Sequence, residues 1–164
     1  MSPRLIIRPF EPRDAPRLDA IRAEAFAPVF ASFRTLLGDE IARIALVDAE
    51  QEQKALLAGL CAGHADTHVF VAARGADPIG FVCTRLERVK GLGEIILDAV
   101  SPSEARKGVG TALIEHALCF IRSRGMRAAV VGVGGDASHA PARRAYAKAG
   151  FKEGIASIHL YRLL

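Results

Sequence analysis

Residues 100–113 read VSPSEARKGVGTAL and join an apolar, β-type run at 94–100 to a segment with helical spacing at 111–124. The sequence therefore predicts a strand that passes through a turn-rich, glycine-bearing loop into a helix. Helix N-termini carry unpaired backbone N–H groups and the positive end of the helix dipole, so they bind phosphate groups well. We expect an anion site where this loop enters the helix.

The loop contains a pair of glycines that would let its backbone approach an anion closely. Gly108 and Gly110 carry no side chain to obstruct the approach, and Arg106 and Lys107 add positive charge at the same point. A Gly-x-Gly pair alone is also common in ordinary strand-to-helix turns. The third glycine of the dinucleotide fingerprint and the Gly-Lys-Ser/Thr ending of a P-loop are missing, which excludes both of those nucleotide motifs.

The rest of the chain alternates between helical and β-type patterns, without a repeat or a linker that would divide it. We therefore expect a single domain over residues 1–164. The expected strands are 5–8, 69–73, 79–84, 94–100, 128–133 and a closing strand at 157–163, with a hairpin over 69–84. The expected helices are 14–26, two between 33 and 60 with a break at 48–53, 111–124 and 141–148.

Composition and charge narrow the class of protein. A net charge of +4 and a pI near 9.3 suit a polyanionic ligand such as a nucleotide cofactor, and would also suit nucleic acid. Nucleic-acid binding is disfavoured because the basic residues are scattered, aromatic residues make up only 6% and Trp is absent. No apolar run approaches the roughly 20 residues that span a bilayer, so no membrane segment is expected.

The three cysteines are an odd number and contain no Cys-x-x-Cys pair. This argues against a disulfide framework and against a zinc site, and it favours a reducing compartment. We expect a cytoplasmic protein that holds no metal.

Two motifs, in the right order, carry a resemblance to a known family. The first comprises Val100-Ser101-Pro102 and, six residues further on, Val109-Gly110-Thr111-Ala112-Leu113. The second is Ala142-x-x-x-Tyr146-x-Lys148-x-Gly150-Phe151. These two motifs resemble the acetyl-coenzyme A signature of the GNAT superfamily of N-acetyltransferases. The order of elements over nearly the whole chain is also similar to that family.

The resemblance implies an α/β (α+β) fold with a mixed, mainly antiparallel central sheet and helices on both faces. The fourth and fifth strands, 94–100 and 128–133, would be parallel and splayed around the pantetheine arm of acetyl-coenzyme A, with the pyrophosphate on the loop amides. The implied cofactor contacts are Ala99, Val100, Arg106, Lys107, Gly108, Val109, Gly110, Thr111, His139, Ala142 and Tyr146. Two positions depart from the family: Ala105 replaces the usual Gln or Arg, and His139 replaces the frequent Asn.

Acyl transfer to an amine requires removal of a proton from the ammonium, stabilisation of an oxyanion and protonation of the departing thiolate. The resemblance implies that Tyr146 is the acid. It implies that Glu94 is the base, because Glu94 lies six residues before Val100, as in histone-acetylating members. Asp98 is expected on the same strand face as Glu94, since the two are four residues apart. Glu94, Asp98, His139 and water all stay open as the base.

We therefore expect an N-acetyltransferase that moves an acetyl group from acetyl-coenzyme A to a primary amine by direct attack in a ternary complex. The acceptor could be a small molecule, a peptide or a protein, because variable loops build its pocket and the fold does not determine it. The alternative is a non-catalytic sensor of acyl-coenzyme A, which Ala105 and His139 keep open. The apolar helices before residue 63, or the last strand, could form a homodimer.

Overall fold

The computed structural model describes residues 4–164, which contain one five-stranded sheet. The strands are β1 (Leu5–Pro9), β2 (Thr67–Arg74), β3 (Asp77–Glu87), β4 (Leu92–Val100) and β5 (Ala128–Val131). They lie in chain order across the sheet, and every pair is antiparallel except β4 and β5. This confirms the mixed, mainly antiparallel sheet with parallel fourth and fifth strands.

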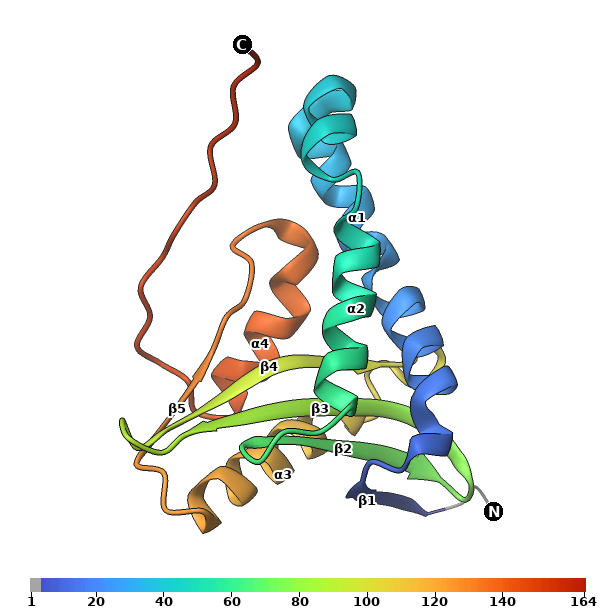
Figure 1. Cartoon of the computed structure of the whole chain (residues 1–164), viewed down its shortest axis with the longest axis vertical. Coiled ribbons are helices and arrows are strands. Elements are labelled where there is room, and N and C mark those ends of the chain that lie inside the picture. The colour runs from blue at the N-terminus through green and yellow to red at the C-terminus, as the bar shows by residue number, and fades with distance from the viewer. Residues whose placement is uncertain (1–3) are drawn as a thin grey trace.

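Helices cover both faces of the sheet (Figure 1). On one face lie α1 (Ala15–Ala45) and α2 (Ala49–Cys61), and on the other lies α3 (Val109–Ser123). The short helix α4 (Ala140–Lys148) contributes Tyr146 to the buried cluster on the α3 face. The single-turn helices are η1 (Pro12–Asp14), η2 (Pro102–Glu104) and η3 (Ala137–His139).

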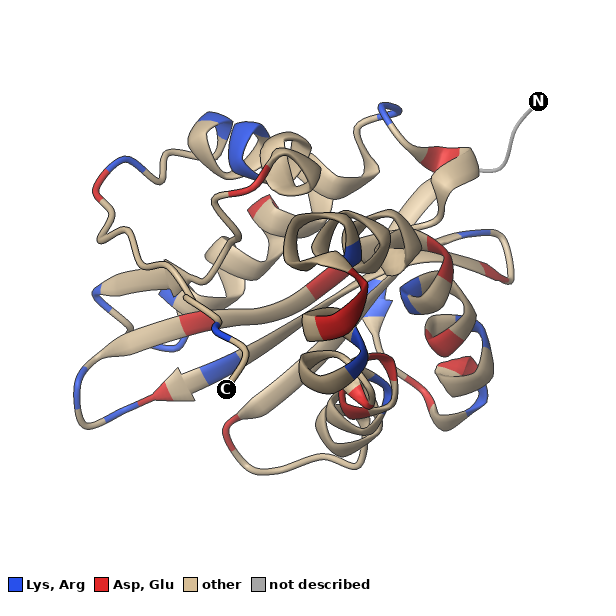
Figure 2. Ribbon diagram, turned by 90° about the horizontal axis from the view of Figure 1, so that it is seen from above, with Lys and Arg blue, Asp and Glu red and all other residues tan. Residues whose placement is uncertain are grey.

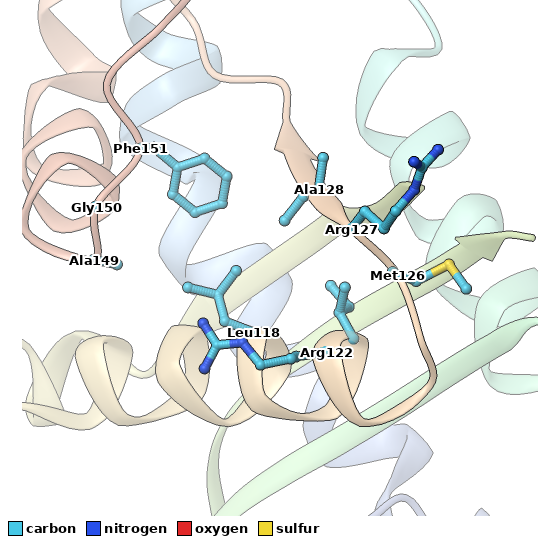
Figure 3. Close-up of a pocket in the computed structure, with 10 residues that line it drawn as sticks. Leu118, Arg122, Met126, Arg127, Ala128, Ala149, Gly150 and Phe151 are labelled. Atoms are coloured by element: carbon cyan, nitrogen blue, oxygen red, sulfur yellow. The ribbon is translucent and has the colours of Figure 1, made fainter. Parts of the chain in front are cut away.

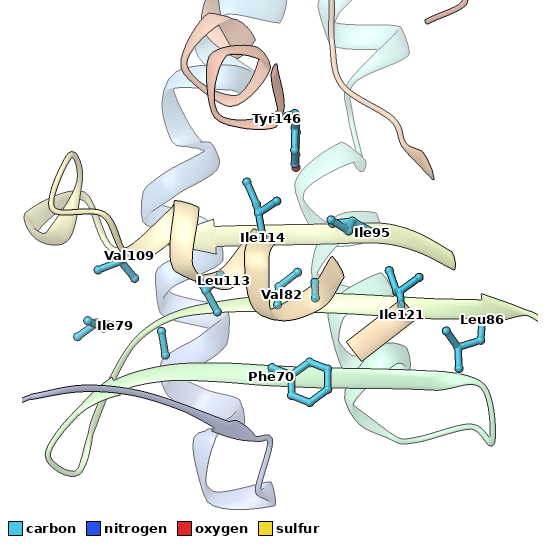
Figure 4. Close-up of a cluster of buried hydrophobic side chains, with 12 residues drawn as sticks. Phe70, Ile79, Val82, Leu86, Ile95, Val109, Leu113, Ile114, Ile121 and Tyr146 are labelled. Atoms are coloured by element: carbon cyan, nitrogen blue, oxygen red, sulfur yellow. The ribbon is translucent and has the colours of Figure 1, made fainter. Parts of the chain in front are cut away.

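Each face of the sheet has its own apolar cluster. On the α3 face, Leu113, Ile114 and Ile121 of α3 form a buried cluster with Val82 of β3 and Ile95 of β4, and Tyr146 lies above Ile114 (Figure 4). The apolar stripe of α3 is the one that the sequence spacing predicts. On the other face, the members are Leu18 and Ile21 of α1, Leu57 and Leu60 of α2, and Val69, Val71, Phe81, Cys83, Leu97 and Ala99 of the sheet.

A β-bulge divides β4 into two halves. Thr84 of β3 pairs with Ile95, but the preceding Cys83 pairs with Leu97, so Ile96 is an extra residue. Pairing between β4 and β5 is recorded up to Ile95, and the second half of β4 pairs with β3. The two parallel strands therefore separate after the bulge, at the place where the resemblance implies a splay.

The first helix is longer than the sequence predicts. One helix runs from Ala15 to Ala45, interrupted at Gly38 by non-helical backbone (φ 73°, ψ 162°), instead of ending near residue 26. Pro28 lies within it but is exposed, so water can hydrate the carbonyl that loses its N–H partner. Despite this length, neither α1 nor any other helix within residues 4–164 is apolar enough over a sufficient span to cross a membrane.

The predicted closing strand at 157–163 is wrong, because residues 151–164 form neither helix nor strand. The segment leaves α4 and runs away from the sheet in an extended form (Figure 1), with Ile158 79% and Leu160 85% exposed. A strand needs a neighbour for its backbone groups, and no strand within residues 4–164 pairs with this segment. At the sheet edge, β5 instead borders a hollow of about 250 Å³ lined by Leu118, Met126 and Phe151 (Figure 3).

Candidate functional site

The separation of β4 from β5 opens into a cavity of about 760 Å³. The second half of β4 contributes residues 96–100, and the end of β5 with its following loop contributes residues 131–133. The other walls come from α1, the start of α3, η3 and α4. The cavity thus brings together the two sequence motifs and the strands between which the cofactor arm is expected.

One end of the cavity is the N-terminus of α3. Gly108 caps this helix with a left-handed backbone (φ 83°), which glycine adopts without strain. Gly108, Gly110 and Thr111 line the cavity, and a Cβ at Gly108 would meet nothing within 4 Å. Free N–H groups and the helix dipole make this end suitable for a phosphate group.

The remaining predicted residues of the loop have different positions. Arg106 lines the cavity with a left-handed backbone (φ 62°), whereas Lys107 is exposed and forms an ion pair with Glu104. The side chain of Val109 is buried in the α3-face cluster, so only its backbone could contact a ligand. Ala99 and Val100 line the cavity from β4.

Inside the cavity, Tyr146 of α4 donates a hydrogen bond to Asp98 of β4, with 2.5 Å between the phenol oxygen and Oδ1. Tyr146 is only 5% exposed, and Asp98 lies deep beneath the surface with an edge open to the cavity. Burial raises the pKa of the Asp98 carboxyl more than the Tyr146 hydrogen bond lowers it. Burial and the neighbouring carboxylate also raise the pKa of the Tyr146 phenol, so this group stays protonated.

Glu94 does not line this cavity. It pairs across the strands with Arg85, and Arg85 Nη2 lies 2.6 Å from its Oε2. Cross-strand partners share a face, and the bulge at Ile96 shifts the alternation of side chains along β4. Glu94 therefore lies on the α1–α2 face and Asp98 on the α3 face, so the expectation that they share a face is wrong.

His139 lines the cavity from η3 and is held in place by Asp136, whose Oδ1 is 2.6 Å from His139 Nδ1. Asp136 also accepts hydrogen bonds from Ser138, and Ser32 of α1 donates to it at 3.3 Å. The hydrogen bonds from Ser138 and His139 lower the pKa of Asp136 to about 2 against the opposing effect of burial. Phe33 of α1 stacks on the His139 ring, with 5.8 Å between the ring centroids.

The backbone beside Asp136 and His139 leaves room for these two side chains. A side chain at Gly134 would collide with both His139 and Asp136. Arg143 of α4 donates to the backbone carbonyls of Gly134 and Asp136, at 2.5 and 2.7 Å. The loop between β5 and α4 is thereby tied to α1 on one side and to α4 on the other.

The sequence reasoning missed several lining residues, above all Phe26 and Val29 of α1 and Arg144 of α4. The α1 residues could have been found from the sequence. Apolar side chains recur through 25–33, past residue 26 where the helix was expected to end, and so indicate a longer helix. Within residues 4–164, no group of three or more His, Cys, Asp or Glu side chains could hold a metal ion.

Comparison with known proteins identifies the family. The model of the acetyltransferase (GNAT) family matches residues 32–151. A mycothiol acetyltransferase of Streptomyces bingchenggensis is 33% identical over 82 residues, which cover 50% of this chain but only 26% of that protein. The chain therefore spans about a quarter of that relative.

Two solved structures share the fold at low identity. A GNAT family acetyltransferase from Brucella melitensis in complex with acetyl-CoA has a TM-score of 0.64 and 24% identity, covering 92% of this chain and 84% of its own. An aminoglycoside acetyltransferase from an uncultured soil metagenomic sample has a TM-score of 0.61 and 21% identity, covering 98% and 96%. Because the family model spans most of its length, this chain belongs to the acetyltransferase (GNAT) family.

Proposed function

We propose that this chain is an N-acetyltransferase that transfers an acetyl group from acetyl-coenzyme A to a primary amine by direct attack in a ternary complex. The observation that carries the proposal is one continuous cavity. It connects the N-terminus of α3, suited to a pyrophosphate, with the hydrogen-bonded pair Tyr146–Asp98. Membership of the acetyltransferase (GNAT) family supports the same activity.

The residues present fit acetyl-coenzyme A. The backbone of residues 108–111 would hold its pyrophosphate, with Arg106 and Lys107 adding positive charge. Ala99, Val100, His139 and Ala142 line the route along which the pantetheine arm would run. The edge of β4 that turns from β5 after Ile95 faces this route, so its backbone can offer hydrogen bonds to an extended ligand.

Tyr146 is proposed as the acid that protonates the departing thiolate. A phenol with a raised pKa gives up its proton only if another proton replaces it. Asp98 can supply that proton, because it accepts the hydrogen bond of Tyr146 and its own raised pKa favours the protonated form. In the balanced reaction, the ammonium nitrogen loses two protons. One reaches Asp98 and replaces the Tyr146 proton that goes to the sulfur, and the other leaves to solvent.

The base is proposed to be Asp98, directly or through water. Glu94 was expected in this role by resemblance, but its ion pair with Arg85 and its position outside the cavity favour a structural role on the sheet surface. His139 is the alternative acceptor of the proton, because Asp136 engages its Nδ1 and leaves Nε2 as the basic nitrogen.

Two further features are included in the proposal. The three cysteines are free, which supports a reducing, cytoplasmic location. The exposed apolar C-terminal segment supports a homodimer. The alternative function, a sensor that binds acyl-coenzyme A without transfer, is kept because Ala105 and His139 depart from the family.

The test is thiol release from acetyl-coenzyme A across amines, polyamines, aminoglycosides, amino acids and basic peptides. Replacing Tyr146 by Phe should lower turnover about 100-fold or more, as loss of a general acid does, while the affinity for acetyl-coenzyme A changes less than about twofold. Tyr161→Phe, in the C-terminal segment, is the matched control and should leave both unchanged. Binding without thiol release for every acceptor would support the sensor instead.

A further inference from the structure

The wall of the cavity that α1 contributes is apolar. Ala25, Phe26, Pro28 and Val29 line it, and Ile96 with Leu97 of β4 lies on the same side of the sheet. None of these side chains carries a charge or a hydrogen-bonding group. An acceptor that approaches the acetyl group past α1 therefore contacts hydrocarbon and the ring of Phe26.

The acidic side chains around the cavity are engaged elsewhere, with one exception. Glu104 is bound to Arg74 and Lys107, at 3.0 and 3.1 Å. As described above, Arg85 holds the carboxylate of Glu94 and His139 holds that of Asp136. Among the residues that line the cavity, only Asp98 offers a carboxylate without a cationic partner in the described ion pairs.

Positive charge is present in the same cavity. Arg106 and Arg144 both line it, and the whole chain has a net charge of +4. Figure 2 shows acidic and basic positions interspersed over the elements, without a region where acidic residues alone gather. The other lining carboxylate, Glu104, is held by Arg74 and Lys107, so a polycation would find no second carboxylate free to pair with it in the cavity.

We propose that the acceptor is a monoamine with an apolar body, in contrast to a polyamine or an aminoglycoside. The inference rests on the proposed function and names its acceptor class. The single ammonium would meet Asp98, and the apolar body would pack against Phe26 and Val29 of α1. Burial of the body provides affinity, and each additional ammonium would have to be desolvated without a partner.

The experiment measures amine binding separately from transfer. 2-Phenylethylamine and spermine are titrated calorimetrically, at 150 mM salt, into the full chain saturated with coenzyme A, in which no transfer can occur. The wild type should bind 2-phenylethylamine at least about tenfold more tightly than spermine. Equal binding, tighter binding of spermine, or no binding of 2-phenylethylamine would overturn the proposal.

A pair of variants on α1 tests the wall itself. Val29→Asp places a carboxylate on the cavity wall and should shift the preference toward spermine by about tenfold or more. Ala27→Asp adds the same charge at an exposed position of α1 and should leave the preference unchanged. An identical effect of both variants would mean that bulk charge, not the wall, sets the preference, and would overturn the assignment.

The same samples, supplied with acetyl-coenzyme A, separate this inference from the proposed function. Preferential binding of 2-phenylethylamine without thiol release would contradict the proposed acetyl transfer and support the proposed preference for an apolar monoamine. Thiol release with spermine in preference to 2-phenylethylamine would support the transferase and overturn the acceptor class.

Discussion

Asp98 is the residue at which stability and activity oppose each other. In an unfolded chain its carboxyl would titrate near 3.9, and burial raises that pKa in the folded protein. Between the two pKa values the folded protein binds more protons than the unfolded chain. The free energy of unfolding contributed by Asp98 therefore falls as the pH rises through this window.

Asp98→Asn should stabilise the protein at pH 8, because it removes a carboxylate whose charge is disfavoured by burial, while the amide oxygen can still accept from Tyr146. The gain in melting temperature should shrink toward pH 3, below the unfolded pKa, where Asp98 is protonated in both states. Turnover should fall about 100-fold or more, as expected for loss of a proton-transfer group. A variant less stable than the wild type at pH 8 would contradict this account of Asp98.

At the scale of elements, the close packing of α3 on β4 depends on Gly93. A Cβ at this position would collide with Ile121 of α3, a member of the buried cluster. Gly93→Ala should therefore destabilise the protein by about 1–3 kcal/mol through overpacking. The matched control is Gly135→Ala, in an exposed loop where a Cβ meets nothing within 4 Å. Chemical denaturation measures both, and equal stability of the two variants would refute the close contact.

Elements that depend on local pattern could be predicted from sequence, and those that depend on a partner could not. The stripe of α3 and the loop before it follow from residue spacing, and Tyr146 was located through its motif. The bulge at Ile96 has no local signature, because it exists only in the register between β3 and β4. Missing it led to the wrong face for Glu94, and the Tyr146–Asp98 contact joins residues 48 positions apart.

The C-terminal segment shows the same limit. Alternating side chains at 157–163 satisfy the pattern of a strand, yet the segment runs away from the sheet and pairs with no strand within residues 4–164, although β5 lies at the sheet edge. The helix that was expected to end near residue 26 continues past Pro28 as α1, because the exposed side of a helix tolerates a proline.

At the scale of the whole molecule, exposed apolar side chains are concentrated in the last residues of the chain. Ile158 and Leu160 are exposed in this segment, which lies away from the sheet. Such side chains favour association, so the chain should form homodimers at micromolar concentration, with a mass twice the 17.5 kDa of one chain.

Leu160→Asp should shift the protein to the monomer, whereas Val89→Asp, at an even more exposed apolar position outside the segment, should not. Size-exclusion chromatography with light scattering over a concentration series checks both variants. A wild type that stays monomeric at every concentration would contradict the dimer.

The central claim is that acetyl-coenzyme A occupies the cavity between β4 and β5 with its pyrophosphate at the N-terminus of α3. A Cβ at Gly110 would point toward Val100 at 3.7 Å, so a large side chain there would enter the cavity. Gly59 is exposed on α2 and provides the control position.

The most direct measurement is a calorimetric titration of acetyl-coenzyme A into the wild type, Gly110→Trp and Gly59→Trp, each checked for folding by circular dichroism. The wild type and Gly59→Trp should bind one equivalent with equal affinity, and Gly110→Trp should bind about 100-fold more weakly or not at all. Undiminished binding by a folded Gly110→Trp variant, or no binding by the wild type, would contradict the cofactor site.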